Sequence, residues 1–183
     1  MSTTKQYNNC NKKGLLGEQA CYSLCRQILP IAYYIKDTRD IPEFQEKDID
    51  FVIDKNILGQ VYIEAKYAGI DGGADVFETI KNTTKGTLGW ALGSQAHYVT
   101  IYKEPLNEIH IINMALCRPF IKANMNNPKY KHYVKKTYSI YNEGQVLYAT
   151  DNIRIPYKDL KDNKVIAAIF SYRNNSWEQT YIS

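Results

Sequence analysis

The sequence has 183 residues, of which 44% are hydrophobic and 23% are charged, as in ordinary globular proteins. A chain of this length can bury a core without disulfides or a structural metal, so we expect a single domain over residues 1–183. No apolar run approaches the roughly 18 residues that a membrane span requires. The polar start of the chain also lacks the apolar core of a signal peptide. These features argue against a membrane protein and predict a cytoplasmic one.

The net charge of +4 is concentrated in one segment. No acidic residue occurs between Glu108 and Glu143, whereas six basic residues do. Within this segment, KYKHYVKKTYSIY interleaves lysines with tyrosines, a composition suited to phosphates and exposed bases. The alternative is a solvated edge hairpin whose lysines discourage aggregation. The nucleic-acid interpretation assigns binding to Lys129, Lys131, Lys135 and Lys136.

The cysteines Cys10, Cys21, Cys25 and Cys117 lack paired CxxC spacing, so we expect free thiols and no zinc site. Cys21 and Cys25 are four residues apart and should share one face of a helix.

The predicted elements follow one another along the chain as helices and strands. After a polar tail of about a dozen residues, an apolar periodicity predicts a helix over 14–30, and a strand follows at 31–37. Alternation predicts a hairpin from strands 49–54 and 60–67, then a helix within 75–95, and strands that begin at His97 and Glu108. A short helix is expected at 115–124, strands at 131–141, 145–156 and 164–172, and a helical turn at 157–162. This order predicts an α/β fold with a mixed central sheet flanked by helices.

The hairpin carries the candidate catalytic residues. Side chains alternate along a strand, so Glu64 and Lys66 should share one face, while Ile63 and Ala65 face the core. Asp50 opens the preceding strand, and the turn brings it close to Glu64. Carboxylate oxygens are preferred Mg²⁺ ligands, so the hairpin predicts a magnesium site with a lysine beside it.

Alternatives remain for this site. Asp48 and Asp54 share the face of Asp50, and Asp48 could be the metal ligand instead. Glu18, on the first helix, could reach the same pocket. A Glu-x-Lys triplet on a solvent-exposed strand face is otherwise an ion pair that contributes little.

A helix glutamate, a strand aspartate and Glu-x-Lys on the next strand resemble the PD-(D/E)XK nuclease superfamily, over residues 14 to about 114. The spacing is similar to that of small restriction-type enzymes and archaeal-type Holliday junction resolvases. The resemblance implies a restriction-endonuclease-like αβββαβ core, followed by a basic, β-rich appendage over about 115–183. It also implies that Asp50, Glu64 and the backbone carbonyl of Ala65 bind Mg²⁺, for which Mn²⁺ can substitute, and that Lys66 positions the attacking water. Ile49 stands where the motif has proline.

The function expected from these residues is a Mg²⁺-dependent DNA endonuclease that hydrolyses phosphodiester bonds with metal-activated water. The assigned catalytic residues are Glu18, Asp50, Glu64 and Lys66. Lys81 and Lys85, on the helix expected after the hairpin, would bind backbone phosphates. A homodimer is expected, since two cuts need two sites. The alternative function is a nucleic-acid-binding module that keeps the nuclease fold without catalysis.

Overall fold

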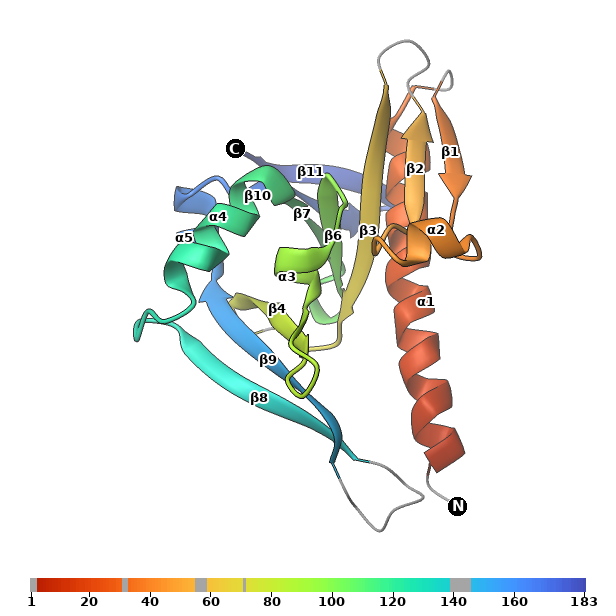
Figure 1. Cartoon of the computed structure of the whole chain (residues 1–183). Helices are drawn as coiled ribbons and strands as arrows, with labels where there is room; N and C mark the ends of the chain where they lie inside the picture. Colours follow the sequence, from red (N-terminus) through yellow and green to blue (C-terminus); the bar gives the residue numbers. More distant parts are fainter. Residues whose placement is uncertain (1–2, 31–32, 55–58, 71, 139–145) are drawn as a thin grey trace.

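The computed structural model describes residues 3–30, 33–54, 59–70, 72–138 and 146–183, with side chains except at 3–11, 137–138 and 146–148. The chain forms a mixed α/β structure with two sheets (Figure 1). The larger sheet has the strand order β1-β2-β3-β6-β7-β10-β11. Its strands are β1 (Tyr34–Asp37), β2 (Phe51–Asp54), β3 (Gln60–Ala68), β6 (Tyr98–Lys103), β7 (Glu108–Asn113), β10 (Ile166–Arg173) and β11 (Ser176–Ile182).

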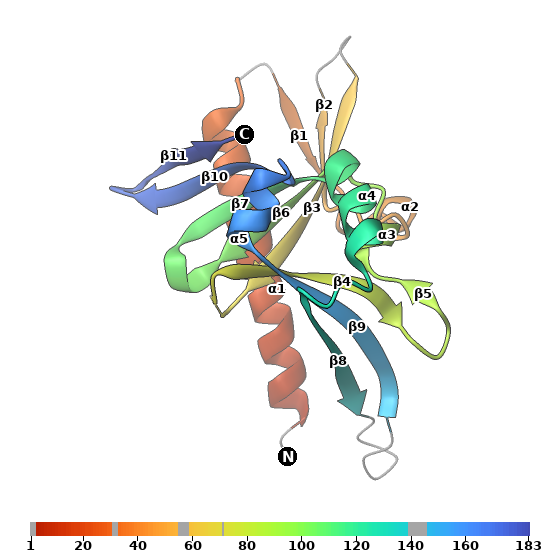
Figure 2. The ribbon, with the colours of Figure 1, turned by 90° about the vertical axis from the view of Figure 1, so that its left-hand side faces the viewer.

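All neighbours in this larger sheet are antiparallel except β3 and β6, which run parallel. The mixed sheet predicted from the element order is therefore confirmed. The smaller sheet is antiparallel, with the order β5 (Thr87–Leu88), β4 (Ala74–Asn82), β9 (Val146–Pro156) and β8 (Lys131–Tyr138). It lies across one end of the larger sheet, next to the end of β3 (Figures 1 and 2).

Helix α1 (Thr3–Ile28) packs along one face of the larger sheet. Cys21 and Cys25 are buried there with Phe51, Ile63 and Ala65, and the thiols of Cys21, Cys25 and Cys117 are free, as predicted. The helix begins well before the expected start at residue 14. Residues 3–13 contain no proline or glycine to stop it, and these first turns extend beyond the larger sheet (Figure 2).

The prediction of a helix within residues 75–95 is wrong. This segment forms β4, a turn, the short β5 and a single helical turn, α3 (Trp90–Gly93). The β4 sequence has the alternation of a strand, because Phe77 and Thr79 are buried while Val76 is exposed. The parallel connection from β3 to β6 therefore runs through the second sheet and not through a crossover helix.

Residues 115–183, expected as an appendage, contribute to both sheets. The predicted short helix is α4 (Met114–Asn124), and the predicted helical turn is α5 (Tyr157–Asp162). The predicted strands correspond to β8, β9 and β10, whereas β11 was not anticipated. The remaining elements are the one-turn helices α2 (Pro42–Gln45) and η2 (Glu104–Leu106). Within the described parts of the chain, no helix is long and apolar enough to cross a membrane.

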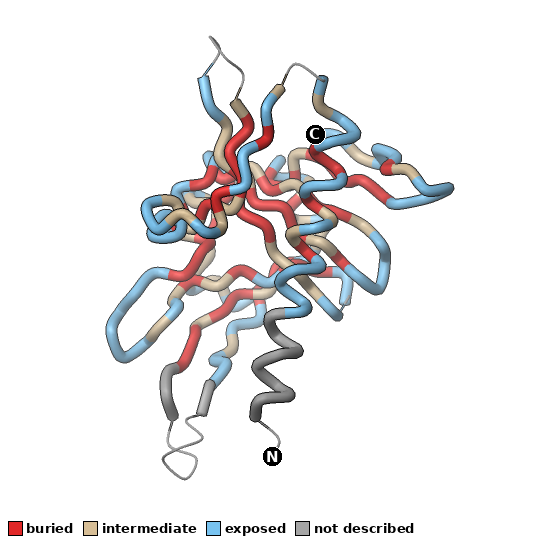
Figure 3. Tube along the Cα trace, turned by 90° about the vertical axis from the view of Figure 1, so that its right-hand side faces the viewer, coloured by how far each residue is buried: buried red, intermediate tan, exposed pale blue. Residues whose placement is uncertain are grey.

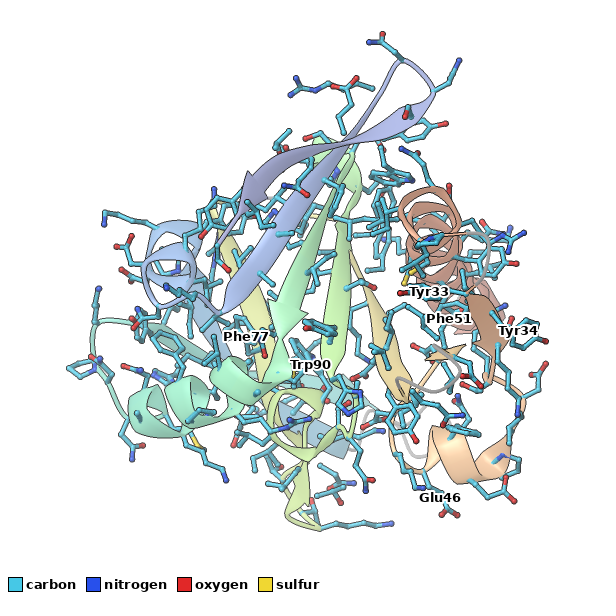
Figure 4. All side chains as sticks on the ribbon, turned by 90° about the horizontal axis from the view of Figure 1, so that it is seen from above. Tyr33, Tyr34, Glu46, Phe51, Phe77 and Trp90 are labelled. Atoms are coloured by element: carbon cyan, nitrogen blue, oxygen red, sulfur yellow. The ribbon has the colours of Figure 1, made fainter. Side chains whose placement is uncertain are left out.

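The largest core cluster joins the two sheets. Phe77 of β4 and Ile153 of β9 pack with Val99 and Ile112 of the larger sheet. The rings of Phe77 and Trp90 lie 5.3 Å apart between these layers (Figure 4), and the buried segments continue from one sheet into the other (Figure 3). The second sheet is thus held rigidly against the first by apolar burial.

Candidate active site

Asp50 lies at the point where β2 begins to pair with β3. Its backbone N–H donates to the carbonyl of Ile63 at 2.9 Å, while its own carbonyl accepts a hydrogen bond from the N–H of Thr38. The Asp50 carboxylate then binds the next backbone N–H of β3 on this side: its Oδ2 accepts a hydrogen bond from the N–H of Ala65 at 2.7 Å. The N–H and C=O of one strand residue point to the same side, so the Ala65 carbonyl is directed toward this edge as well.

Glu64 is the most deeply buried of the predicted catalytic side chains, with 1% of its surface exposed. Its carboxylate forms an ion pair with the Lys66 ammonium on the same strand face. Beyond this ion pair, neither oxygen accepts a hydrogen bond from the described residues. Burial raises the pKa of Glu64 to about 7, although the positive charge of Lys66 opposes the shift.

Lys66 is surrounded by negative charge. Burial acts to lower the pKa of its ammonium, but the attraction of Glu64, with smaller contributions from Asp50 and Asp48, outweighs burial and raises it. Burial raises the pKa of Asp50, against the opposing effects of the Ala65 N–H and Lys66. In the structure, Lys66 is therefore the cation that balances the carboxylates.

Asp48, the alternative metal ligand, also lies at this site. It adopts a left-handed backbone conformation with φ of 51°, and its carboxylate is 3.6 Å from the Lys81 ammonium. Its negative charge contributes to the raised pKa of Glu64. Asp54 lies at the other end of β2, opposite Gln60. Asp48 and Asp50 therefore both lie where they could bind a metal at this site, whereas Asp54 lies away from it.

Glu18 approaches from the helix side of the sheet. Helix α1 comes very close to β3 at Gly17, where an added Cβ would lie 2.8 Å from the carbonyl oxygen of Lys66. The charge of Glu18 contributes to the raised pKa of Asp50. However, its carboxylate is paired with Arg39, which also binds Asp37. Sequence reasoning missed Arg39, because nothing in its local pattern marks it as a partner of a helix residue.

A second arginine supports the loop beside Glu64. The Arg118 guanidinium donates to the carbonyls of Ser94 and Ala96 at 2.6 and 2.8 Å. The Ser94 hydroxyl in turn donates to the carbonyl of Asp48 at 3.2 Å. Helix α4 therefore positions the loop that holds Asp48, a connection between distant segments that the sequence does not reveal.

Two adjoining cavities open next to these residues, beside the face of the second sheet that carries Val76 and Glu78. The first, of about 650 Å³, is lined by Lys66, Glu78, Lys131, Tyr133, Lys135 and Arg154, among others. The second, of about 680 Å³, shares Glu78 and Lys135 with the first and adds Lys81 and Lys85. Four of the six lysines expected to bind nucleic acid therefore line one continuous hollow.

The other two predicted lysines lie elsewhere. Lys129 forms an ion pair with Asp159 at 2.9 Å. Lys136 follows Lys135 on β8, so its side chain projects from the opposite face of the second sheet.

The donor set suits a hard divalent cation only in part. Glu64 offers a buried carboxylate whose oxygens lack hydrogen bonds from the described residues, which is a suitable environment for Mg²⁺. Yet no group of three or more His, Cys, Asp and Glu side chains in the described part of the chain is gathered closely enough to hold a metal. Two carboxylates and a backbone carbonyl remain the available ligands, since Mg²⁺ usually keeps several waters.

Comparisons with known proteins found no significant match to this chain. The chain matches no protein-family model, and no curated protein or solved structure is significantly similar to it.

Proposed function

We propose that the protein is a metal-dependent DNA endonuclease of the PD-(D/E)XK type. The observation that carries this proposal is the hydrogen bond from the Ala65 N–H to the Asp50 carboxylate. This bond fixes the aspartate of one strand beside the middle residue of Glu64-Ala65-Lys66 on the next. A buried glutamate paired with a lysine two residues later completes the arrangement.

In this proposal, Asp50, Glu64 and the Ala65 carbonyl hold Mg²⁺, and Mn²⁺ can replace it. The metal ion, when bound, supplies positive charge that polarises a phosphoryl oxygen and acidifies a coordinated water. Lys66 donates hydrogen bonds that orient the attacking water and stabilise the negative charge that develops on the phosphate. The water oxygen attacks phosphorus and one P–O bond of the diester breaks, which leaves a phosphate monoester and a hydroxyl group.

The order of the elements around the site supports the proposed restriction-endonuclease-like core. Helix α1 covers an antiparallel β1-β2-β3 meander, and β6 adds in parallel beside β3. The departure is the connection between β3 and β6, where β4, β5 and α3 replace the helix of the αβββαβ pattern. The proposal therefore depends on the site geometry more than on the connection.

The test is cleavage of supercoiled plasmid DNA with Mg²⁺, with Mn²⁺ and with EDTA. We expect cleavage only with metal, and at least a roughly 10²-fold loss of rate in Glu64→Gln, Asp50→Asn and Lys66→Met. Glu46→Gln is the matched control, because Glu46 is exposed beside α2 (Figure 4) and the substitution is the same. Asp48→Asn tests the alternative ligand: a loss in Asp48→Asn with full activity in Asp50→Asn would exchange their roles.

One observation favours a second candidate, a nucleic-acid-binding module without catalysis. The Lys66 ammonium already balances the carboxylates, and the described residues contain no three-ligand metal group. This candidate predicts that wild type and all the variants bind DNA equally and that none cleaves it. Such a result would overturn the nuclease proposal.

A further inference from the structure

The exposed face of the second sheet carries a regular pattern of cations around one aromatic ring. Lys131, Tyr133 and Lys135 alternate along β8 and all three line the first cavity, so they project from the same face. The residues between them, His132 and Val134, project from the other face, where Val134 is 54% exposed. Tyr133, which is half-buried, therefore stands between two lysines in the lining of a hollow.

The neighbouring strands extend this hollow. Asn152 and Arg154 of β9 line the same cavity, and Arg154 is held by a hydrogen bond to the carbonyl of Gly72 at 2.7 Å. Glu78 of β4 is the acidic residue that lines both cavities. Burial raises the pKa of its carboxyl, while the charges of Lys66, Lys81 and Lys135 act to lower it. Asp75 also lines the first cavity but is paired with Lys103, as Lys66 is with Glu64 and Lys81 with Asp48. Apart from these pairs, the lining carries Lys85, Lys131, Lys135 and Arg154 against Glu78, so the hollow retains an excess of positive charge.

We propose that this face, defined by Lys131, Tyr133, Lys135, Asn152 and Arg154 and called here the basic face, binds single-stranded nucleic acid. Lys131 and Lys135 are four residues apart on β8, which spans about 13 Å and is comparable to twice the separation of neighbouring phosphates in an extended single strand. Lys131 and Lys135 can therefore pair with phosphates while Tyr133 stacks on a base between them. Only an unpaired base offers its ring face to such stacking.

The dimensions of the hollow also favour a single strand. Cavities of about 650 and 680 Å³ accommodate individual nucleotides, whereas a duplex would have to lie across their rims. The opposite face of β4 and β9 is buried, because Phe77, Ile153 and Ile155 belong to the core shared with the larger sheet. The basic face is thus preformed, and little ordering cost should oppose binding.

Lys66 links the basic face to the candidate active site. It lines the same cavity as Tyr133, and its ammonium pairs with Glu64. A strand bound on the basic face would lead its backbone toward these residues. The cleavage of that strand rests on the proposed function, whereas its binding does not.

The test is fluorescence anisotropy in EDTA with a labelled 12-nucleotide single-stranded DNA, the RNA of the same sequence and the blunt DNA duplex. We expect either single strand to bind at least tenfold more tightly than the duplex. The comparison of DNA with RNA identifies which single strand is preferred. Omitting metal separates binding from catalysis, so a failure of cleavage leaves this measurement intact.

Two matched pairs of variants locate the binding. Tyr133→Ala should weaken single-strand binding by roughly tenfold through loss of stacking, whereas Tyr133→Phe should keep it. Lys135→Ala should lower the salt dependence of log K by about 0.7, the contribution of one phosphate contact to a single strand. Lys136→Ala removes the same charge from the opposite face and should leave affinity and salt dependence unchanged. Thermal unfolding of each variant checks that the fold is intact.

Three results would overturn the proposal. The first is duplex binding as tight as single-strand binding. The second is an unchanged affinity in Tyr133→Ala, and the third is an equal effect of Lys135→Ala and Lys136→Ala.

Discussion

The ammonium of Lys103 lies 2.9 Å from Oδ1 of Asp75, and both side chains are buried where β6 of the larger sheet meets β4 of the second. The other oxygen of Asp75 is 2.9 Å from Nδ1 of His110 on β7. Burial acts to raise the pKa of Asp75, but the contacts with His110 and Lys103 outweigh burial and lower it. This cluster fastens the two sheets together with charges that water does not screen.

We expect Lys103→Met to destabilise the protein by about 3–5 kcal/mol, because the Asp75 carboxylate would stay buried with only His110 to compensate it. The double variant Lys103→Met/Asp75→Asn should recover part of the loss, since it removes the buried charge as well. Urea denaturation followed by circular dichroism measures both. Lys158→Met is the control, because its ion pair with Asp162 is exposed and its removal should not change stability measurably. A double variant no more stable than Lys103→Met would contradict this account.

The raised pKa of Glu64 predicts a pH dependence of stability in the metal-free protein. The folded-state pKa of about 7 exceeds the ordinary value of 4.5, so the folded state binds the proton more tightly than the unfolded state. The stabilising contribution is complete below pH 4.5 and is lost as pH rises through about 7. At pH 8 the loss is on the order of 3 kcal/mol.

Glu64→Gln removes this titration. In EDTA, its melting temperature should exceed that of wild type at pH 8, and the two should converge near pH 5. Lys66 would still be balanced by Asp50 and Asp48 in this variant. A difference in melting temperature that is constant between pH 5 and pH 8 would show that Glu64 does not titrate in this range.

Because α1 approaches β3 closely at Gly17 but not at Gly14, replacing these two glycines with alanine should change the stability in opposite directions. Gly17→Ala should destabilise the protein by about 1–3 kcal/mol, because the new Cβ would lie 2.8 Å from a backbone oxygen of Lys66. Gly14→Ala should stabilise it by up to about 1 kcal/mol, because nothing lies within 4 Å and alanine favours the helix. Chemical denaturation tests both. Equal effects of the two substitutions would mean that α1 does not approach β3 in this way.

Arg118→Met should destabilise the protein by about 1–3 kcal/mol, because the carbonyls of Ser94 and Ala96 would lose their donor. It should also slow DNA cleavage, since Ser94 positions Asp48 beside Glu64. Lys122→Met, an exposed site on the same helix, is the matched control for both measurements. Wild-type cleavage in an Arg118→Met protein that remains folded would separate this loop from the active site.

The β2–β3 hairpin was predictable because its information is local. Alternating apolar residues indicated that Glu64 and Lys66 share one face, and the pairing of β2 with β3 places Asp50 close to them. By contrast, Arg118 and Arg39 act on the site through contacts across the fold. Sequence spacing does not report such contacts, so these two residues were missed.

The wrong helix over residues 75–95 has a related cause. Val76, Phe77, Thr79 and Ile80 fit a strand. The sequence-based prediction instead has a helix here, at the position of the second helix in the αβββαβ order. Residues 74–82 form a strand because they pair with β9, which lies far along the chain. Asp75 likewise finds Lys103 and His110 only once both sheets have formed.

This topology has a consequence for the order of folding. β4 follows β3 directly, but its partner β9 arrives late, and contacts between them such as Thr79 with Asp151 are 72 positions apart. Until residues 146–156 are available, one edge of β4 has no strand beside it. A nascent chain thus already carries Asp50, Glu64 and Lys66 before the sheet next to them can close. Assembly of the hollow beside Lys66 should therefore be a late and slow event, as expected for long-range pairing.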